Sequence, residues 1–300
     1  MIGIENISKS YGDIKSLAEI NAAIGSGSIY GLIGSNGSGK STLLRIMSGI
    51  MRPDSGKITY DGKPVYENPE VKETVVYLSD EQFFLPNSTV DEMAYLYSSL
   101  YPSFSKIRYN ELIKLFGLEG SRKISTFSKG MKKQASILLG LACYPKYLLC
   151  DETFDGLDPV MRQFVKKLLA EEVVERGLTP VIASHNLREI EDICDHIGLL
   201  HKGGILFESE IDALKAEIHT VQGVFGEEKS IGEIFAGYHI VSETKRGSLT
   251  TAVIRGDRKA IEDAAKAADP KYFEIIPLTL EEIFISEMEE RGYDYSNVVF

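Results

Sequence analysis

Alternating apolar and polar residues at the start of the chain predict two extended strands. Isoleucines recur over residues 2–7, a Gly-Asp pair at residues 12–13 favours a turn, and a second extended run continues through residues 20–24. Residues 28–33 are a short apolar run bounded by glycines, and a glycine-rich loop leads from it into a helical pattern over residues 43–47. The sequence therefore predicts an antiparallel pair, followed by the order strand, loop and helix.

The middle of the chain alternates between strand and helix signals. Two short strands joined by Asp61-Gly62 predict a hairpin over residues 57–66. Residues 88–125 favour a helical insert, which opens on a capping box of Thr89 and Glu92. Further helices are predicted over residues 134–141, 161–175 and 187–194, and strands over residues 147–150, 180–183 and 197–200. This alternation predicts an α/β fold, a mostly parallel sheet flanked by helices.

The pattern changes after residue 216. The remaining elements are a hairpin over residues 241–254, a helix over 259–267, a strand over 272–276 and a last helix capped by Thr279. A chain of 300 residues is longer than one average domain. We therefore expect a large domain over residues 1–216 and a small α/β accessory domain over residues 217–300.

The composition is that of a globular protein, with 43% hydrophobic and 26% charged residues. Because 33 Lys and Arg face 44 Asp and Glu, the net charge is -11, and we expect no nucleic-acid partner. The chain shows no secretory signal pattern and no apolar run long enough to cross a bilayer. Its three cysteines lack the paired spacing of metal or redox sites. The expected location is the cytoplasm, and any membrane role must come through a partner chain.

A glycine-rich motif joins the predicted strand at residues 28–33 to the helix that follows. The residues Gly34, Ser35, Asn36, Gly37, Ser38, Gly39, Lys40, Ser41 and Thr42 match the pattern G-x-x-x-x-G-K-[ST]. The glycines let consecutive backbone NH groups turn toward an anion, and the helix adds its positive N-terminal end. In such a motif the lysine reaches the β and γ phosphates and the serine hydroxyl ligates Mg²⁺. We therefore expect these nine residues to bind a nucleotide.

Two acidic residues, Asp151 and Glu152, follow the apolar strand predicted at residues 147–150. A phosphate loop needs a metal partner and a group that activates water. At the carboxyl end of a strand, Asp151 can hold Mg²⁺ together with Ser41, and Glu152 can orient or deprotonate the attacking water. The pair predicts hydrolysis of the nucleotide.

Four further motifs occur in a fixed order over residues 2–208. They are Tyr11, the loop Phe127-Ser128-Lys129-Gly130-Met131, the segment Asp155-Gly156-Leu157-Asp158, and His185 after a strand. With the phosphate loop and the acidic pair, they make the chain resemble the ATP-binding subunits of ABC transporters. In that family the loop is the LSGGQ signature, the second segment is the D-loop, the histidine is the switch histidine, and the aromatic residue stacks on adenine.

The resemblance implies a P-loop ATPase of ABC type, with an antiparallel β subdomain, a helical insert and ATP and Mg²⁺ as cofactors. Two such subunits, identical or related, pair head to tail, so that Ser128 and Gly130 of one cover the ATP held by the other. His185 holds the γ phosphate and the water, and Asp158 communicates across the interface. The resemblance also implies a separate transmembrane permease and a position on the inner face of the plasma membrane.

Two positions depart from the family pattern. The signature carries Lys129 and Met131 where Gly and Gln are common, while the serine and the second glycine are retained. In the loop that usually offers a glutamine to Mg²⁺ and water, Asp80 stands at the aligned position, with Gln82 close by. A carboxylate can ligate Mg²⁺, so we favour Asp80 over Gln82 as metal ligand and catalytic residue.

Several functional alternatives stay open from the sequence. An exporter is favoured over an importer by the C-terminal extension, which ends in the helix at residues 280–284. A translation or DNA-repair ATPase of the same type is the alternative to a transporter, although neither the length nor the acidic balance favours it. Phe83 and Phe84 either help to form the groove that receives a permease helix or fill the core beneath the helical insert.

Overall fold

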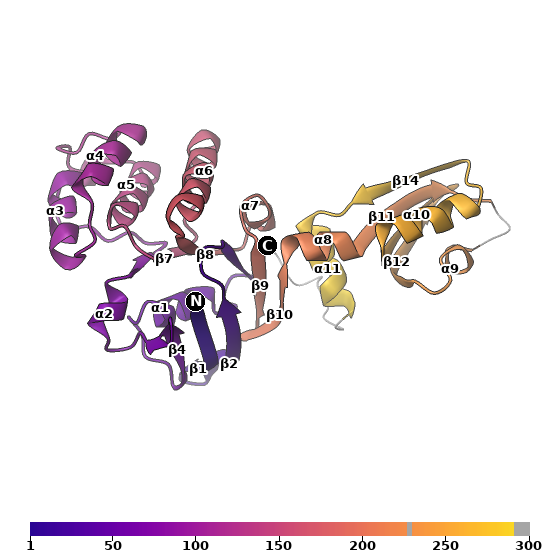
Figure 1. Cartoon of the computed structure of the whole chain (residues 1–300), viewed down its shortest axis with the longest axis horizontal. Helices are drawn as coiled ribbons and strands as arrows, with labels where there is room; N and C mark the ends of the chain where they lie inside the picture. The colour runs from indigo at the N-terminus through magenta and orange to yellow at the C-terminus, as the bar shows by residue number, and fades with distance from the viewer. Residues whose placement is uncertain (227–229, 291–300) are drawn as a thin grey trace. The chain divides into compact units, whose positions relative to one another are not determined.

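The computed structural model describes residues 1–226 and 230–290 of the chain. These residues form two compact units that divide after Glu208 (Figure 1). The change in sequence pattern falls at residue 216, whereas helix α8 (Ile211–Glu217) already belongs to the second unit. The functional motifs found in the sequence all lie in the first unit.

The first unit contains two sheets. The N-terminal sheet has the order β2-β1-β4-β5, made by Ile14–Ile24, Ile2–Tyr11, Ser55–Tyr60 and Lys63–Pro64. The central sheet has the order β10-β9-β3-β8-β7-β6, made by Gly204–Glu210, His196–His201, Tyr30–Ile33, Thr179–Ser184, Tyr147–Asp151 and Val75–Leu78. From β9 to β6 each neighbouring pair in this sheet is parallel. The prediction of a mostly parallel sheet is confirmed.

The N-terminal sheet follows the predicted pattern closely. Strands β1 and β2 pair antiparallel, and Leu17 and every isoleucine of the two strands except the exposed Ile14 are buried. The β4–β5 hairpin turns at Asp61 and Gly62, whose φ angles are 49° and 82°. Two positive φ angles in succession are what a type I′ turn requires, and Asp and Gly are among the residues that tolerate them.

The helices of the first unit cover both faces of the central sheet. They are α1 (Lys40–Met47), α2 (Pro69–Lys72), α3 (Val90–Leu100), α4 (Lys106–Leu115), the 3-10 turn Ile124–Thr126, α5 (Lys129–Ala142), α6 (Pro159–Arg176) and α7 (Leu187–Glu191). Figure 1 shows α1 on the side of the N-terminal sheet and α5, α6 and α7 on the opposite side. The main hydrophobic core therefore lies where α1 packs between the two sheets, and it includes Leu43, Leu44 and Met47.

The helical insert contains α3 and α4. Thr89 and Glu92 form the capping box expected from the sequence, because each side chain accepts a hydrogen bond from the other residue's backbone NH. Such a cap satisfies two donors that a helix start would otherwise leave unpaired. The insert returns to the central sheet through α5, whose Gly140 lies against Leu78 of β6.

The second unit is a four-stranded antiparallel sheet with helices. The strand order is β12-β13-β11-β14, made by His239–Arg246, Leu249–Arg255, Ile218–Val224 and Tyr272–Pro277. Its helices are α8, α9 (Ile231–Ile234), α10 (Arg258–Ala267) and α11 (Leu280–Glu290). Buried side chains of α10 and of the loop after α9 pack on one face of the sheet and give this unit a core of its own.

The pattern of the sequence misses several short elements. Strand β6 has four residues and α2 has one turn, which is too short for either periodicity to show. The elements β10, α8, β11 and α9 also lack a predicted counterpart. Helix α7 ends at Glu191 rather than at residue 194, because the Ile193 NH donates to the Ile190 carbonyl three residues before it, which interrupts the i to i−4 pattern of the α-helix.

A buried carboxylate joins the helical insert to α6 and yields a stability prediction. Glu172 is 3% exposed and accepts hydrogen bonds from the guanidinium groups of Arg108 and Arg176. Replacing Glu172 with Ala removes the anion shared by two partly buried guanidinium groups and leaves Arg108 with only the exposed Glu111, so we expect a loss of about 3 kcal/mol in the free energy of unfolding.

Urea denaturation measures this loss, and Glu171→Ala is the matched control. Glu171 is half exposed and, among the described residues, pairs with Lys167 on the helix surface, so its removal should cost less than about 1 kcal/mol. Equal losses of stability in the two variants would contradict the role of Glu172 as the buried anion that joins the helical insert to α6.

Candidate nucleotide-binding site

The phosphate loop connects β3 to α1 at the carboxyl end of the central sheet. Helix α1 begins at Lys40, and the preceding Gly39 has a φ of 110°. A Cβ at Gly39 would lie 2.6 Å from the carbonyl oxygen of Ser16, and one at Gly34 would lie 2.4 Å from that of Leu200. Gly37 also has a positive φ, of 79°, but faces open space. The loop therefore needs glycine at two positions for space and at two for backbone conformation.

Lys40 is buried beneath this loop and is only 5% exposed. Its ammonium donates to the carbonyl oxygens of Gly34 at 2.6 Å and Ser35 at 3.3 Å, and it lies 3.6 Å from Oε1 of Glu152. Burial lowers the pKa of Lys40, while the charges of Glu152 and Asp151 act in the opposite direction. The loop thus surrounds a positive charge with one carboxylate close to it.

Asp151 ends strand β7 and faces the start of α1. Its carboxylate accepts hydrogen bonds from the hydroxyls of Ser41 at 3.0 Å and Tyr77 at 2.8 Å, and the side chain is almost fully buried. Burial, followed by the charge of Asp151, raises the pKa of Tyr77 well above its usual range. The hydroxyl of Ser41 and the carboxylate of Asp151 form a set of oxygen donors of the kind that Mg²⁺ prefers.

Tyr77 was not a candidate on sequence grounds. It lies on β6, where Tyr77 pairs with Leu149 of β7, and this register brings its hydroxyl to Asp151. A tyrosine in a short apolar run carries no sign of such a role.

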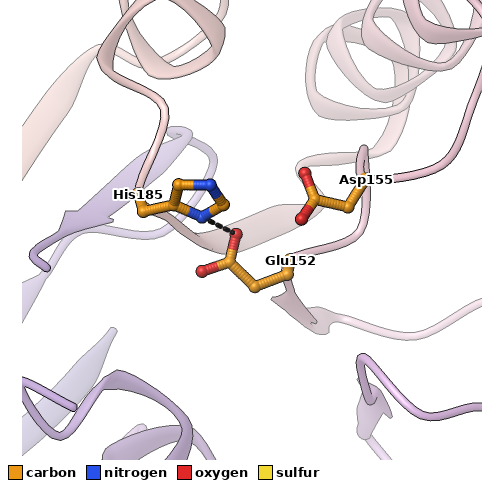
Figure 2. Close-up of side chains that lie close together, drawn as sticks. All are labelled: Glu152, Asp155 and His185. Atoms are coloured by element: carbon orange, nitrogen blue, oxygen red, sulfur yellow. Dashed lines mark hydrogen bonds and ion pairs between the residues drawn. The ribbon is translucent and has the colours of Figure 1, made fainter. Parts of the chain in front are cut away.

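Glu152, Asp155 and His185 converge beside the phosphate loop (Figure 2). Glu152 has a φ of 46°, unusual for a residue other than glycine, and its NH donates to the Ala183 carbonyl at 3.0 Å. This turn directs its carboxylate away from Asp151 and toward His185, whose Nδ1 lies 2.9 Å from Oε2. A carboxylate oxygen of Asp155 and ligand atoms of the other two side chains all lie within 4.8 Å of one another.

The remaining loop residues differ in exposure. Asn36 is exposed, whereas Ser38 is 4% exposed and its Oγ has no hydrogen-bond partner among the described residues. The Ser35 carbonyl accepts from the Ser38 NH at 3.1 Å, and Thr42 Oγ1 accepts from Ser16 Oγ at 3.1 Å. A buried hydroxyl without a partner, beside a buried ammonium and a helix N-terminus, fits a bound phosphate group.

The signature loop stands at the start of α5, away from the phosphate loop of the same chain. Ser128 caps the helix by accepting from the Met131 NH at 3.2 Å, and a Cβ at Gly130 would lie 3.0 Å from the Gly156 carbonyl oxygen. Asp158 caps α6 in the same way, through the Met161 NH at 2.9 Å. Within the described residues, no hydrogen bond or ion pair joins Ser128 or Gly130 to the phosphate loop.

The segment after β6 contains Asp80 and Gln82, which behave differently. The carboxylate of Asp80 forms an ion pair with Lys133 of α5 at 3.1 Å. The side-chain amide of Gln82 instead donates to the backbone carbonyl of Asp80 and, at 3.4 Å, to that of Ser79. The Asp80 side chain is half exposed, and that of Gln82 is partly exposed. The choice of Asp80 over Gln82 as metal ligand stays a prediction.

Tyr11 lies at the end of β1 with 46% of its surface exposed. Its hydroxyl donates to the sulfur of Met51 at 3.0 Å, which fixes the outer edge of the ring. About half of the Tyr11 side chain is thus accessible, which leaves ring surface available for stacking. Its stacking on adenine stays a prediction.

Comparison with known proteins identifies the family. A family model described as ABC transporter matches residues 17–155. The ABC transporter ATP-binding protein YtrB of Bacillus subtilis (strain 168) is 31% identical over 287 residues, covering 96% of this chain and 98% of that protein. The bacitracin transport ATP-binding protein BcrA of Bacillus licheniformis is 33% identical, covering 72% of this chain and 71% of that protein. A solved structure of an ATP binding subunit of an ABC transporter is 26% identical with a TM-score of 0.67, covering 72% of this chain and 92% of that one.

The chain belongs to the ATP-binding subunits of ABC transporters, a family of ATPases. Such subunits bind ATP and work with separate membrane subunits. The expected fold class and transporter role are confirmed, and the alternative of a translation or DNA-repair ATPase is not favoured. None of the helices in the described residues has the length and apolar character to cross a membrane.

The glycines of the phosphate loop give a second stability prediction. Gly39→Ala combines a positive φ with a clash against the Ser16 carbonyl, so we expect a loss of about 3 kcal/mol in the free energy of unfolding. Gly37→Ala is the matched control, because it carries the positive φ without the clash and should cost about 1 kcal/mol. Thermal denaturation of both variants measures the difference, and equal losses would contradict the clash.

Proposed function

We propose that this chain is the Mg²⁺-dependent ATPase subunit of an exporter, working as a head-to-tail dimer beneath a separate permease. The observation that carries the proposal is the convergence of the phosphate loop, Asp151, Glu152 and His185 at one edge of the central sheet. These groups supply what ATP hydrolysis needs, namely a phosphate cradle, a set of metal ligands and a base beside them.

The phosphate-binding roles follow from the positions of the side chains. Lys40 releases the Gly34 carbonyl and binds the β and γ phosphates, together with the NH groups of residues 34–42. Ser41, Asp151 and Asp80 hold Mg²⁺, with Tyr77 orienting the Asp151 carboxylate. The bound ion supplies positive charge that offsets the charge of the phosphates. The exposed ring of Tyr11 stacks on adenine.

Water activation falls to Glu152, with His185 as its partner. Glu152 accepts the proton of the attacking water, and the imidazole, now 2.9 Å from its carboxylate, turns to hydrogen-bond the γ phosphate. Lys40 takes part in both phosphate binding and water activation, because its ammonium lies 3.6 Å from the Glu152 carboxylate and also donates to the loop carbonyls. Phosphate binding and the position of the base are therefore linked through one ammonium.

The dimer is inferred from the lack of any hydrogen bond or ion pair, among the described residues, between the signature loop and the phosphate loop. Ser128 caps α5, and Gly130 in its first turn lies beside Gly156 of the Asp155–Asp158 segment. In a head-to-tail pair, the hydroxyl, the NH groups and the helix N-terminus of one copy bind the γ phosphate held by the other. ATP then joins the two copies, identical or related, and hydrolysis lets them part.

The permease and the export direction rest on two further features. Phe83 is 75% and Leu85 is 45% exposed, whereas Phe84 between them is only partly exposed. Phe83 and Leu85 therefore do not fill the core and can dock a membrane subunit, while the partial burial of Phe84 fits either of its two predicted roles. The C-terminal unit ends in α11, whose Ile283 and Phe284 are buried, and this extension resembles that of exporters. The similarity to a bacitracin transport subunit supports a transport role, and the permease places the chain on the inner face of the plasma membrane.

Glu152→Gln tests the catalytic assignment. The variant should bind ATP and Mg²⁺ but hydrolyse ATP more slowly by a factor on the order of 10², because the water loses its base. Sedimentation with ATP and Mg²⁺ should then show a trapped dimer. Lys40→Ala is the control, which should stay monomeric because it no longer holds the phosphates. A Glu152→Gln protein that remains monomeric would count against the dimer.

Phe83→Ala tests the docking assignment. Because the ring is exposed, its loss should leave stability within about 0.5 kcal/mol of the wild type and leave the ATPase rate of the isolated subunit unchanged. Binding to the coexpressed permease should weaken by about 2 kcal/mol, measured by co-purification from membranes. Val174→Ala, at an 86% exposed position on α6, should not change it. Normal permease binding by Phe83→Ala would overturn the docking site.

A further inference from the structure

Lys133, in the second turn of α5, is a buried lysine that the nucleotide site does not use. Its side chain is 2% exposed. In the part of the chain that the structure describes, its ammonium has two hydrogen-bond acceptors, and both belong to Asp80: Oδ1 at 3.1 Å and the backbone carbonyl at 3.3 Å. A buried ammonium without partners is strongly unfavourable. Lys133 therefore restrains the Asp80 side chain, although that side chain is 52% exposed.

This ion pair lies beside the proposed metal ligands. Gly140, two turns after Lys133 on α5, lies against Leu78, and Asp80 follows Leu78 by two residues. Leu78 pairs with Cys150 of the neighbouring strand β7, directly before Asp151.

We propose that Lys133 is a positioning residue that holds the Asp80 carboxylate away from Mg²⁺ and so sets how strongly Mg²⁺ enhances ATP binding. The inference rests on the proposed function, in which Asp80 is a ligand of the ion. Mg²⁺ must compete with the ammonium for the same carboxylate. The apparent affinity for the ion is therefore lower when a smaller fraction of Asp80 is free of Lys133. The positive charge of Lys133 also repels the ion, which lowers the apparent affinity for Mg²⁺ further.

The competition also connects the metal site to the signature loop. Helix α5 begins at the Ser128 cap. Within the described residues, the hydrogen bonds that the Lys133 ammonium donates to the segment after β6 both go to Asp80. When Asp80 turns to Mg²⁺, α5 loses this side-chain bond, and the signature loop at its N-terminus is held less tightly. In the dimer that loop covers the partner's nucleotide, so metal binding at one site acts on the other.

The test compares the affinity for AMP-PNP, a nonhydrolysed ATP analogue, with Mg²⁺ and with EDTA in the full chain. The ratio of the two dissociation constants is the Mg²⁺ enhancement. Lys133→Met should raise this enhancement about threefold to tenfold, because Asp80 is released to the ion. Asp80→Asn should lower it, and the double variant should behave like Asp80→Asn. Lys133→Arg, which restores the charge, should return the enhancement to the wild-type value.

Lys132→Met is the matched control, because it removes a neighbouring charge that has no bond to Asp80. It should leave the enhancement unchanged. The affinity in EDTA reports whether each variant is folded and able to bind nucleotide. An enhancement that is unchanged or lowered in Lys133→Met, with normal binding in EDTA, would overturn this inference alone. A wild-type protein that binds no AMP-PNP under either condition would overturn the proposed function as well.

Discussion

The parallel register of three neighbouring strands is the constraint on which the site depends. Ile33 of β3 pairs with Ser184 of β8, and Ala183 of β8 pairs with Asp151 of β7, so the three strands end at the same level. The residues that follow them are the phosphate loop, His185 and Glu152. Segments that lie far apart in the sequence thus present their reactive groups at one edge of the sheet, as ligand sites in parallel α/β sheets commonly do. A slip of one residue between these strands would turn the ligands to the opposite face.

Burial makes the charges at this edge depend on one another. Lys40 and Asp151 are both almost inaccessible to water, so each needs partners, and the structure supplies them within the site: Gly34 and Glu152 for the ammonium, Ser41 and Tyr77 for the carboxylate. A phosphate group that enters the loop takes over part of this bonding. Nucleotide binding would therefore exchange partners among buried groups, and Glu152, which contacts Lys40, is the group most directly affected.

The sequence predicted the parts of the site that are carried by motifs and local patterns. The spacing of Gly34 to Thr42 identified the phosphate loop, and the acids after an apolar strand identified Asp151 and Glu152. Tyr77 and Lys133 could not be found in this way, because their roles arise from strand register and from helix packing between segments far apart in the chain. Strand β6 was missed for a related reason, since four buried residues show no periodicity of their own. The roles assigned to the site residues and the limits of the two domains stay predictions.

The central claim is that each copy completes the nucleotide site of the other. A structure of the Glu152→Gln protein with ATP and Mg²⁺, determined in solution by cryo-electron microscopy, tests it most directly. The account predicts that Ser128 Oγ of one copy lies within hydrogen-bond distance, about 3 Å, of the γ phosphate bound by Lys40 of the other. A nucleotide held by one copy alone, with Ser128 of every neighbouring molecule remote from its γ phosphate, would contradict the account.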